Sequence, residues 1–307
     1  MASLDVTSLD VSPESDLRCS VQTAALGEHP AGSAGFARRV LLVELPLPWP
    51  KKIDQHELLA GLDLTDKTVK LLGIRSSEAT ELVRHRVICW ERTEPFRGFV
   101  RTETLVDRPD LEATIQAIAV DGPDAIDEPI DIDPTTQDLL ICTHGTRDRC
   151  CGQLGTRLHL DLDCAFEPNV RMWRTSHTGG HRFAPTGIHF PHGTTWSTLT
   201  PELTVAIVGQ ALATDRLSGH YRGNLGIQGR PAQVAEGATF LEQGWGWLHS
   251  ERTVDVAETD DDHAVATVRS ANHEATVTMR KDEAIPVPAC GEDLEASTKA
   301  TPQYRII

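Results

Sequence analysis

The chain has 307 residues, of which 39% are hydrophobic, so it is long enough to bury a core in one large domain or two ordinary ones. It carries 29 basic residues against 45 acidic ones, which gives a formal net charge of −16. This negative surface disfavours nucleic acids and anionic membranes as partners, and it favours a partner protein with a basic surface.

The cysteines and the N-terminal residues indicate a cellular compartment. The chain has seven cysteines, an odd number, and four of them are scattered without the pattern of a disulfide scaffold: Cys19, Cys89, Cys164 and Cys290. The first residues lack the basic start and the apolar core of a signal peptide, and no apolar run approaches the length of a membrane span. We therefore expect a cytoplasmic protein, because in a reducing cytosol clustered cysteines and histidines are more often ligands or redox groups than disulfides.

The first part of the chain predicts an N-terminal α/β domain at residues 19–120, after a polar, acidic tail at 1–18 that we expect to be disordered. A helix is expected to begin at Pro109, since proline suits a first helical turn. Residues 121–138 contain seven acidic residues, three prolines and no basic residue, which indicates an acidic linker at 121–137. Strands are predicted at 37–45, 68–74, 85–91 and 98–106.

The segment at 138–226 begins with a short apolar run, residues 138–141, that is typical of a buried strand. Residues 153–162 predict a helix, because leucines recur in it at four-residue spacing. Another strand is predicted at 170–175, followed by a hairpin and by a helix that begins at Thr200. The hairpin strands are expected at 187–190 and 194–197, with His189 and His192 on the protein surface.

The remaining residues predict a small C-terminal extension. A helix at 231–243 is followed by three segments of alternating polarity, which indicate a β meander within residues 227–282. Trp245 and Trp247 are expected to anchor this extension on the body of the protein. The last stretch, 283–307, is polar and contains prolines, so we expect a mobile tail. The alternating segments lie at 253–257, 263–268 and 275–280.

Sulfur and imidazole groups concentrate in two loops that follow two of the predicted strands. Two thiolates and two imidazoles suit zinc or the iron of an iron–sulfur cluster, and the spacing alone does not choose between these metals. The adjacent Gly179 and Gly180 argue against a helix in the second loop and for a loop wrapped closely around a bound group. The groups are Cys142, His144, Cys150 and Cys151 in the first loop, and His177 and His181 in the second.

The two loops also carry recognisable motifs. The first reads Cys-Thr-His-Gly-Thr-Arg-Asp-Arg-Cys-Cys-Gly from Cys142, and the second reads His-Thr-Gly-Gly-His-Arg-Phe-Ala from His177. In this combination they resemble the sucrase/ferredoxin-like family, in which some members are thioredoxin-like ferredoxins with a 2Fe–2S cluster held by two cysteines and two histidines. The resemblance implies Cys142, Cys151, His177 and His181 as the ligands, because the family's second cysteine is the one followed by glycine.

Each of the other polar residues in these loops has two possible roles. Cys150 is interpreted as a spare thiol beside the cluster, because a disulfide between neighbouring residues would be strained; the alternative is a thiol–disulfide switch. His144 either binds or supports the metal, or is only a turn residue. Arg147 and Arg182 either tune the redox potential through their charge or form ordinary solvated ion pairs.

The predicted elements indicate an α/β protein with an N-terminal α/β domain and a small β-rich extension at its C-terminal end. The resemblance implies that the domain between them is a thioredoxin-like ferredoxin domain. The function implied by the resemblance is one-electron transfer through a 2Fe–2S cluster, to or from a redox partner protein. Two alternatives stay open: a zinc-stabilised binding protein without redox activity, and a thiol-dependent oxidoreductase that uses Cys150 or Cys151. An electron carrier is favoured over a self-contained enzyme, and no motif marks the paired carboxylates that a sucrase needs.

Overall fold

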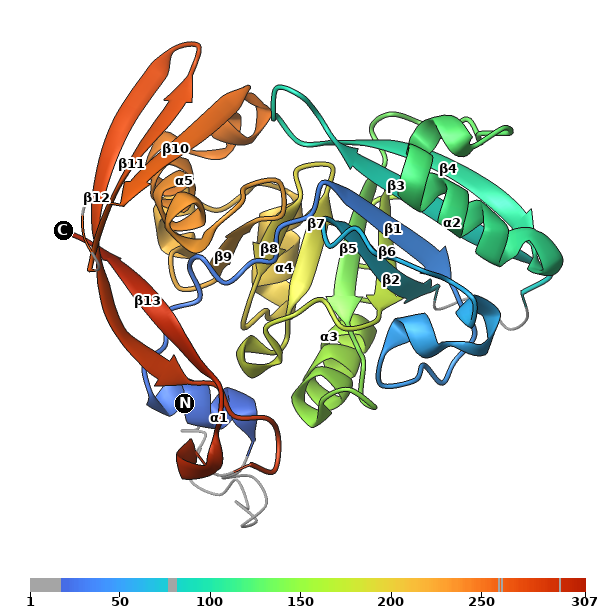
Figure 1. Ribbon diagram of the computed structural model, residues 1–307, viewed down its shortest axis with the longest axis horizontal. Helices are drawn as coiled ribbons and strands as arrows, with labels where there is room; N and C mark the ends of the chain where they lie inside the picture. The colour runs from blue at the N-terminus through green and yellow to red at the C-terminus, as the bar shows by residue number, and fades with distance from the viewer. Residues whose placement is uncertain (1–17, 77–81, 259, 261, 293) are drawn as a thin grey trace, which may run out of the picture.

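The computed structural model describes residues 18–76, 82–258, 260, 262–292 and 294–307. The predicted tail at 1–18 therefore lies outside the described residues, except for its last one. The described part contains two β-sheets with helices packed on them (Figure 1). Among these residues, no helix combines the length and the apolar character that crossing a bilayer requires.

A nine-stranded mixed sheet runs through the centre, in the order β4-β3-β1-β2-β6-β5-β7-β8-β9 (Figure 1). Strands β1 and β2 are parallel, strands β5 and β6 are parallel, and the two pairs meet where β2 runs antiparallel to β6. The ranges 19–120 and 138–226 thus contribute neighbouring strands to one sheet. The strands are β1 (Arg39–Glu44), β2 (Val69–Arg75), β3 (Arg84–Arg92), β4 (Phe99–Asp107), β5 (Gln137–Cys142), β6 (Val170–Thr175), β7 (Gly187–Phe190), β8 (Thr194–Trp196) and β9 (Tyr221–Asn224).

Strand β1 is buried along its whole length because both faces of the sheet are covered there. Its side chains alternate between two cores: Leu41 and Val43 pack with Ile115 and Ile118 of helix α2 (Leu111–Asp121), whereas Leu42 belongs to the core on the opposite face. The helix therefore closes one side of the sheet over β1, β3 and β4 (Figure 1).

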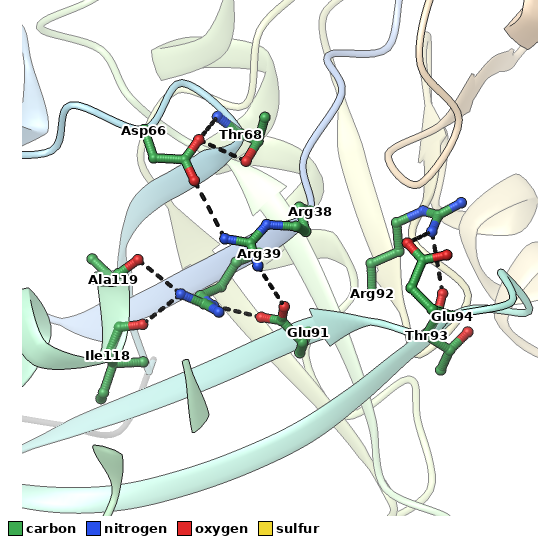
Figure 2. A network of polar contacts seen from close by, with 10 residues as sticks. All are labelled: Arg38, Arg39, Asp66, Thr68, Glu91, Arg92, Thr93, Glu94, Ile118 and Ala119. Carbon is green, nitrogen blue, oxygen red and sulfur yellow. Dashed lines mark hydrogen bonds and ion pairs between the residues drawn. The ribbon is translucent and has the colours of Figure 1, made fainter. Parts of the chain in front are cut away.

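An arginine in β1 fastens this helix to the sheet. The Arg39 guanidinium donates to the backbone oxygens of Ile118 and Ala119, each at 2.7 Å, and pairs with Glu91 on β3 (Figure 2). The last carbonyls of a helix have no partner within the helix, so a buried donor at this place satisfies them. Arg39 thus links β1, β3 and α2 through one side chain.

A separate four-stranded antiparallel sheet forms the C-terminal part, in the order β10-β11-β12-β13. Helix α5 (Arg230–Gln243) packs against both sheets, and Trp247 and Trp245 join the core between them, as the sequence predicts. Strand β13 lies within the range 283–307, where a mobile tail is expected; its backbone pairs with the long strand β12 instead. The strands are β10 (Arg252–Glu258), β11 (His263–Ser270), β12 (His273–Pro286) and β13 (Ala300–Ile306).

The expected α/β class and the predicted hairpin are confirmed, since β7 and β8 pair antiparallel. The surface placement of His189 and His192 is wrong, because both side chains are buried. His189 lies 2.8 Å from Gln137 Oε1, and the ring of His192 packs edge-on against His249. Burial lowers the pKa of His189 to about 4 and that of His192 to about 3. The remaining helices are α1 (Cys19–Ala25), α3 (Thr156–Asp161) and α4 (Pro201–Val208).

Candidate metal centre

The parallel strands β5 and β6 end side by side, and each delivers a candidate ligand just beyond its last residues. Cys142 is the final residue of β5 and is fully buried. Thr143 donates its backbone N–H to Thr175, the last residue of β6, so the loop that carries His177 starts directly beside Cys142. The carboxyl ends of parallel strands are a common place for ligand sites in α/β sheets.

The helix after the first loop is held against the end of β5 by glycine. It contains a π-helical turn, η5 (Cys151–Gly155), and continues into α3. A Cβ on Gly155 would lie 1.8 Å from the carbonyl oxygen of Cys142, and a Cβ on Gly152 would lie 2.4 Å from Gly145 Cα. Only glycine permits this approach, which places Cys151 next to Cys142. The sequence pattern carries no signal that singles out Gly155.

Three of the four predicted ligands come together at this point. The donor atoms of Cys142, Cys151 and His177 all lie within 4.8 Å of one another. The hydrogen bond with the Cys151 thiol holds the pKa of Cys142 well below its usual range, against the effect of burial, and His177 acts in the same direction. The pKa of Cys151 is raised, chiefly through the same hydrogen bond.

His177 also has a ring nitrogen without a hydrogen-bond partner among the described residues. This atom, Nδ1, is buried. A buried polar atom without a partner is costly and calls for an explanation, and a role as a ligand of a metal ion or cluster is one. Two soft thiol sulfurs and an imidazole nitrogen suit both zinc and iron–sulfur clusters. These three donors therefore fit either a zinc ion or an iron–sulfur cluster.

The fourth predicted ligand, His181, is outside the group of three donors and lies beside His177. Its ring centroid is 5.8 Å from that of His177. Its Nδ1 lies 3.1 Å from Asp148 Oδ2 and 3.2 Å from Cys19 Sγ. In metal sites the second nitrogen of a ligating histidine commonly contacts a carboxylate, which fixes the orientation of the ring.

His144 supports the loop that carries His177. Its Nδ1 accepts the backbone N–H of His177 at 3.0 Å, so the ring proton is on Nε2, which lies 2.9 Å from the carbonyl oxygen of Pro50. Burial lowers the pKa of His144, in keeping with this neutral form. Arg147 is exposed. Of the two interpretations of His144, the structure favours the one in which it supports a candidate ligand.

The glycine loop is held by a residue that sequence reasoning missed. Gly179 and Gly180 both have positive φ, +94° and +68°. Arg222, which is buried on β9, donates to the carbonyl oxygen of Gly179 at 3.1 Å and to that of Ser33 at 2.8 Å. Burial lowers the pKa of Arg222 to about 10. Lys70 also reaches this loop and donates to Thr178 O at 3.3 Å. No spacing in the sequence connects these residues.

We expect Gly180→Ala to destabilise the protein more than Gly179→Ala. Both changes meet a positive φ, but only a Cβ on Gly180 meets another residue, Arg222 Nη2 at 2.3 Å; at Gly179 no atom lies within 4 Å. Displacing a buried, hydrogen-bonded arginine should lower the free energy of unfolding by about 1–3 kcal/mol beyond the Gly179→Ala value. Denaturant titration of the two variants measures this difference. Equal losses would contradict the close packing of the loop on Arg222.

Arg182 and Cys150 each have partners that the sequence does not indicate. Arg182 forms a buried ion pair with Glu28, with both N–O distances at 2.6 Å, so the interpretation as a solvated pair is wrong. Cys150 lies outside the group of Cys142, Cys151 and His177 and contacts other side chains: its Sγ lies 3.2 Å from Cys290 Sγ and 3.2 Å from Ser20 Oγ.

The comparisons with known proteins identify the family. No curated protein and no solved structure matches the chain. The family described as Sucrase/ferredoxin-like matches residues 30–223, which is more than half of the chain and includes all four predicted ligands. The chain therefore belongs to the sucrase/ferredoxin-like family.

Proposed function

We propose that the protein is a one-electron carrier that holds a 2Fe–2S cluster through Cys142, Cys151, His177 and His181. The observation that carries this proposal is the meeting of the Cys142 and Cys151 thiols with the imidazole of His177 at the ends of β5 and β6. When bound, the cluster supplies reversible one-electron chemistry. The family membership adds support, since the match covers all four residues.

The surroundings favour thiolate ligands at this position. The buried guanidinium of Arg222 and the ammonium of Lys70 both contact the loop that carries the candidate histidines. The helix that continues through η5 into α3 begins next to Cys150, so its positive end faces the thiols. These positive groups stabilise thiolate charge, and the tight packing around them excludes water.

His181 is suited to bind through the nitrogen that does not contact Asp148. Asp148 Oδ2 accepts from Nδ1 at 3.1 Å and so fixes the ring orientation, while Asp148 Oδ1 accepts the backbone N–H of Cys150 at 2.9 Å. The same carboxylate thereby positions both candidate loops. Such carboxylate contacts commonly orient ligating histidines and raise their basicity.

The proposal includes a thioredoxin-like arrangement around the site. Strands β5 and β6 are parallel, α3 connects them, the hairpin β7–β8 follows antiparallel to β5, and α4 comes next. This strand–helix–strand–hairpin–helix order is the thioredoxin-like one, and the sheet order β6-β5-β7-β8 supports it. We also propose a cytoplasmic location and a redox partner with a basic surface, in keeping with the net charge of −16.

A zinc-stabilised protein without redox activity is the second candidate. The observation that favours it is the compactness of the group, because three donor atoms within 4.8 Å of one another match ligands of a single ion. A thiol-dependent oxidoreductase is less well supported, since Cys150 and Cys151 are each only 1% exposed and reactive thiols need access. Zinc proteins are colourless and accept no electron, which separates the first two candidates.

We expect His177→Cys to lower the midpoint potential of the cluster. With two thiolates and two neutral imidazoles the oxidised unit is neutral, and exchanging one imidazole for a thiolate adds a negative charge that opposes reduction. The spread between Rieske centres and all-cysteine ferredoxins suggests a decrease of roughly 100 mV or more. Anaerobic redox titration measures it, with Cys164→Ser, which changes an exposed thiol, as the control. A variant with full iron content and an unchanged potential would remove His177 from the ligand set.

A further inference from the structure

A second group of thiols lies beside the first and joins three segments that are far apart in the sequence. Cys19 begins α1, Cys150 lies in the first helical turn after the loop that follows β5, and Cys290 follows β12. The Sγ atom of Cys290 is 3.2 Å from that of Cys150 and 3.5 Å from that of Cys19. The fold therefore brings three separate cysteines into mutual contact.

A carboxylate completes this group. Asp148 Oδ1 lies 3.5 Å from Cys290 Sγ, and Asp148 Oδ2 lies 3.6 Å from Cys19 Sγ. Cys19, Cys150 and Asp148 are buried, and Cys290 is partly buried. The four donor atoms all lie within 4.8 Å of one another. Four converging donors from four side chains are the set that a structural metal ion needs.

The spacing of the donors matches one tetrahedral ion. With zinc–sulfur bonds of about 2.3 Å, the edges of a tetrahedral site are about 3.8 Å long, slightly more than the contacts observed between these side chains. Small outward shifts of the side chains would open the site. Thiolates select soft or borderline metals, and the carboxylate oxygen favours zinc over copper(I) among them.

We propose that Cys19, Cys150, Cys290 and Asp148 bind one Zn²⁺ ion, at a site separate from the one formed by Cys142, Cys151 and His177. Binding releases the thiol protons to solvent and leaves zinc thiolates. The ion would fasten α1 and the segment after β12 to the start of the helix that carries Cys151. Cys19 and Cys290 lie outside the range 30–223 that matches the family, so two of the four ligands come from parts of this chain that the match does not cover.

Metal analysis of the full chain, expressed with zinc and iron and purified anaerobically, tests the zinc site. Cys290→Ser should lose zinc and keep iron, whereas Cys142→Ser should lose iron and keep zinc. Cys164→Ser, at an exposed cysteine outside both groups, should keep both metals. This pattern makes the two proposals independent: a chain without iron whose zinc is lost in Cys290→Ser and kept in Cys142→Ser would sink only the electron-carrier proposal.

If Cys290→Ser loses iron as well as zinc, cobalt substitution still tests the zinc site. Co²⁺ added to Cys142→Ser should give the intense absorption of a tetrahedral thiolate site, and the double variant Cys142→Ser/Cys290→Ser should lose it while far-ultraviolet circular dichroism stays unchanged. Three outcomes would overturn the zinc site: no metal bound while the thiols react freely, a disulfide between Cys150 and Cys290 in its place, or zinc that disappears with Cys142→Ser and remains with Cys290→Ser.

Discussion

Cys142→Ser is expected to bind at least about tenfold less iron than the wild type, because changes to residues that merely support a metal ligand already cost 10–100-fold in affinity. Cys142 lies at the end of β5, fully buried, and the hydrogen bond with Cys151 lowers its pKa, which favours the thiolate form that binds metal. Cys151→Ser should behave in the same way. Iron per chain, measured after anaerobic purification, gives the result directly.

Cys150→Ser is the matched control for these variants, because its residue neighbours Cys151 and is equally buried. Its thiol faces Cys290 and Ser20, so the variant should retain iron. The reverse result, with iron lost from Cys150→Ser and kept in Cys151→Ser, would show that the assignment of the second thiol is wrong by one residue.

Gly155→Ala is expected to lower the free energy of unfolding by about 3 kcal/mol or more. An added Cβ would lie 1.8 Å from the carbonyl oxygen of Cys142, and a backbone atom cannot rotate away as a side chain does. The helix must move off the end of β5, which adds backbone displacement to the usual cost of overpacking, about 1–3 kcal/mol. The shift should also separate Cys151 from Cys142, so we expect iron binding to fall with stability.

The control for this variant is Gly35→Ala, since Gly35 is exposed and a Cβ there meets no atom within 4 Å. Denaturant unfolding followed by circular dichroism compares both variants with the wild type. A loss at Gly155→Ala no larger than that at Gly35→Ala would contradict the close approach of the helix to β5.

Local patterns in the sequence account for the elements around the site. The apolar run at 138–141 predicts β5, because a strand that is buried on both faces has apolar residues in succession. The alternating residues at 253–280 predict strands of the second sheet, because a strand that is buried on one face alternates between apolar and polar residues. The two glycines with positive φ also follow from the sequence, since adjacent glycines mark a loop. The assignment of four ligands in the two loops comes from the resemblance of the loop motifs to the family.

The rest depends on contacts between distant segments. Cys19 and Cys290 meet beside Cys150 only because α1 and the segment after β12 pack on the same loop, and no spacing records this. The support of the glycine loop by Arg222 has the same origin. Strand β13 was expected to be a tail because its residues are polar, but backbone pairing to β12 does not require apolar side chains.

Iron and acid-labile sulfide in the anaerobically purified wild type test the central claim most directly. The account predicts two iron atoms and two sulfides per chain, a visible absorption that bleaches when one electron is added, and loss of both signals in Cys142→Ser. A colourless wild type without sulfide, whose metal is a zinc ion lost in Cys142→Ser, would contradict the account and establish the group formed by Cys142, Cys151 and His177 as a zinc site.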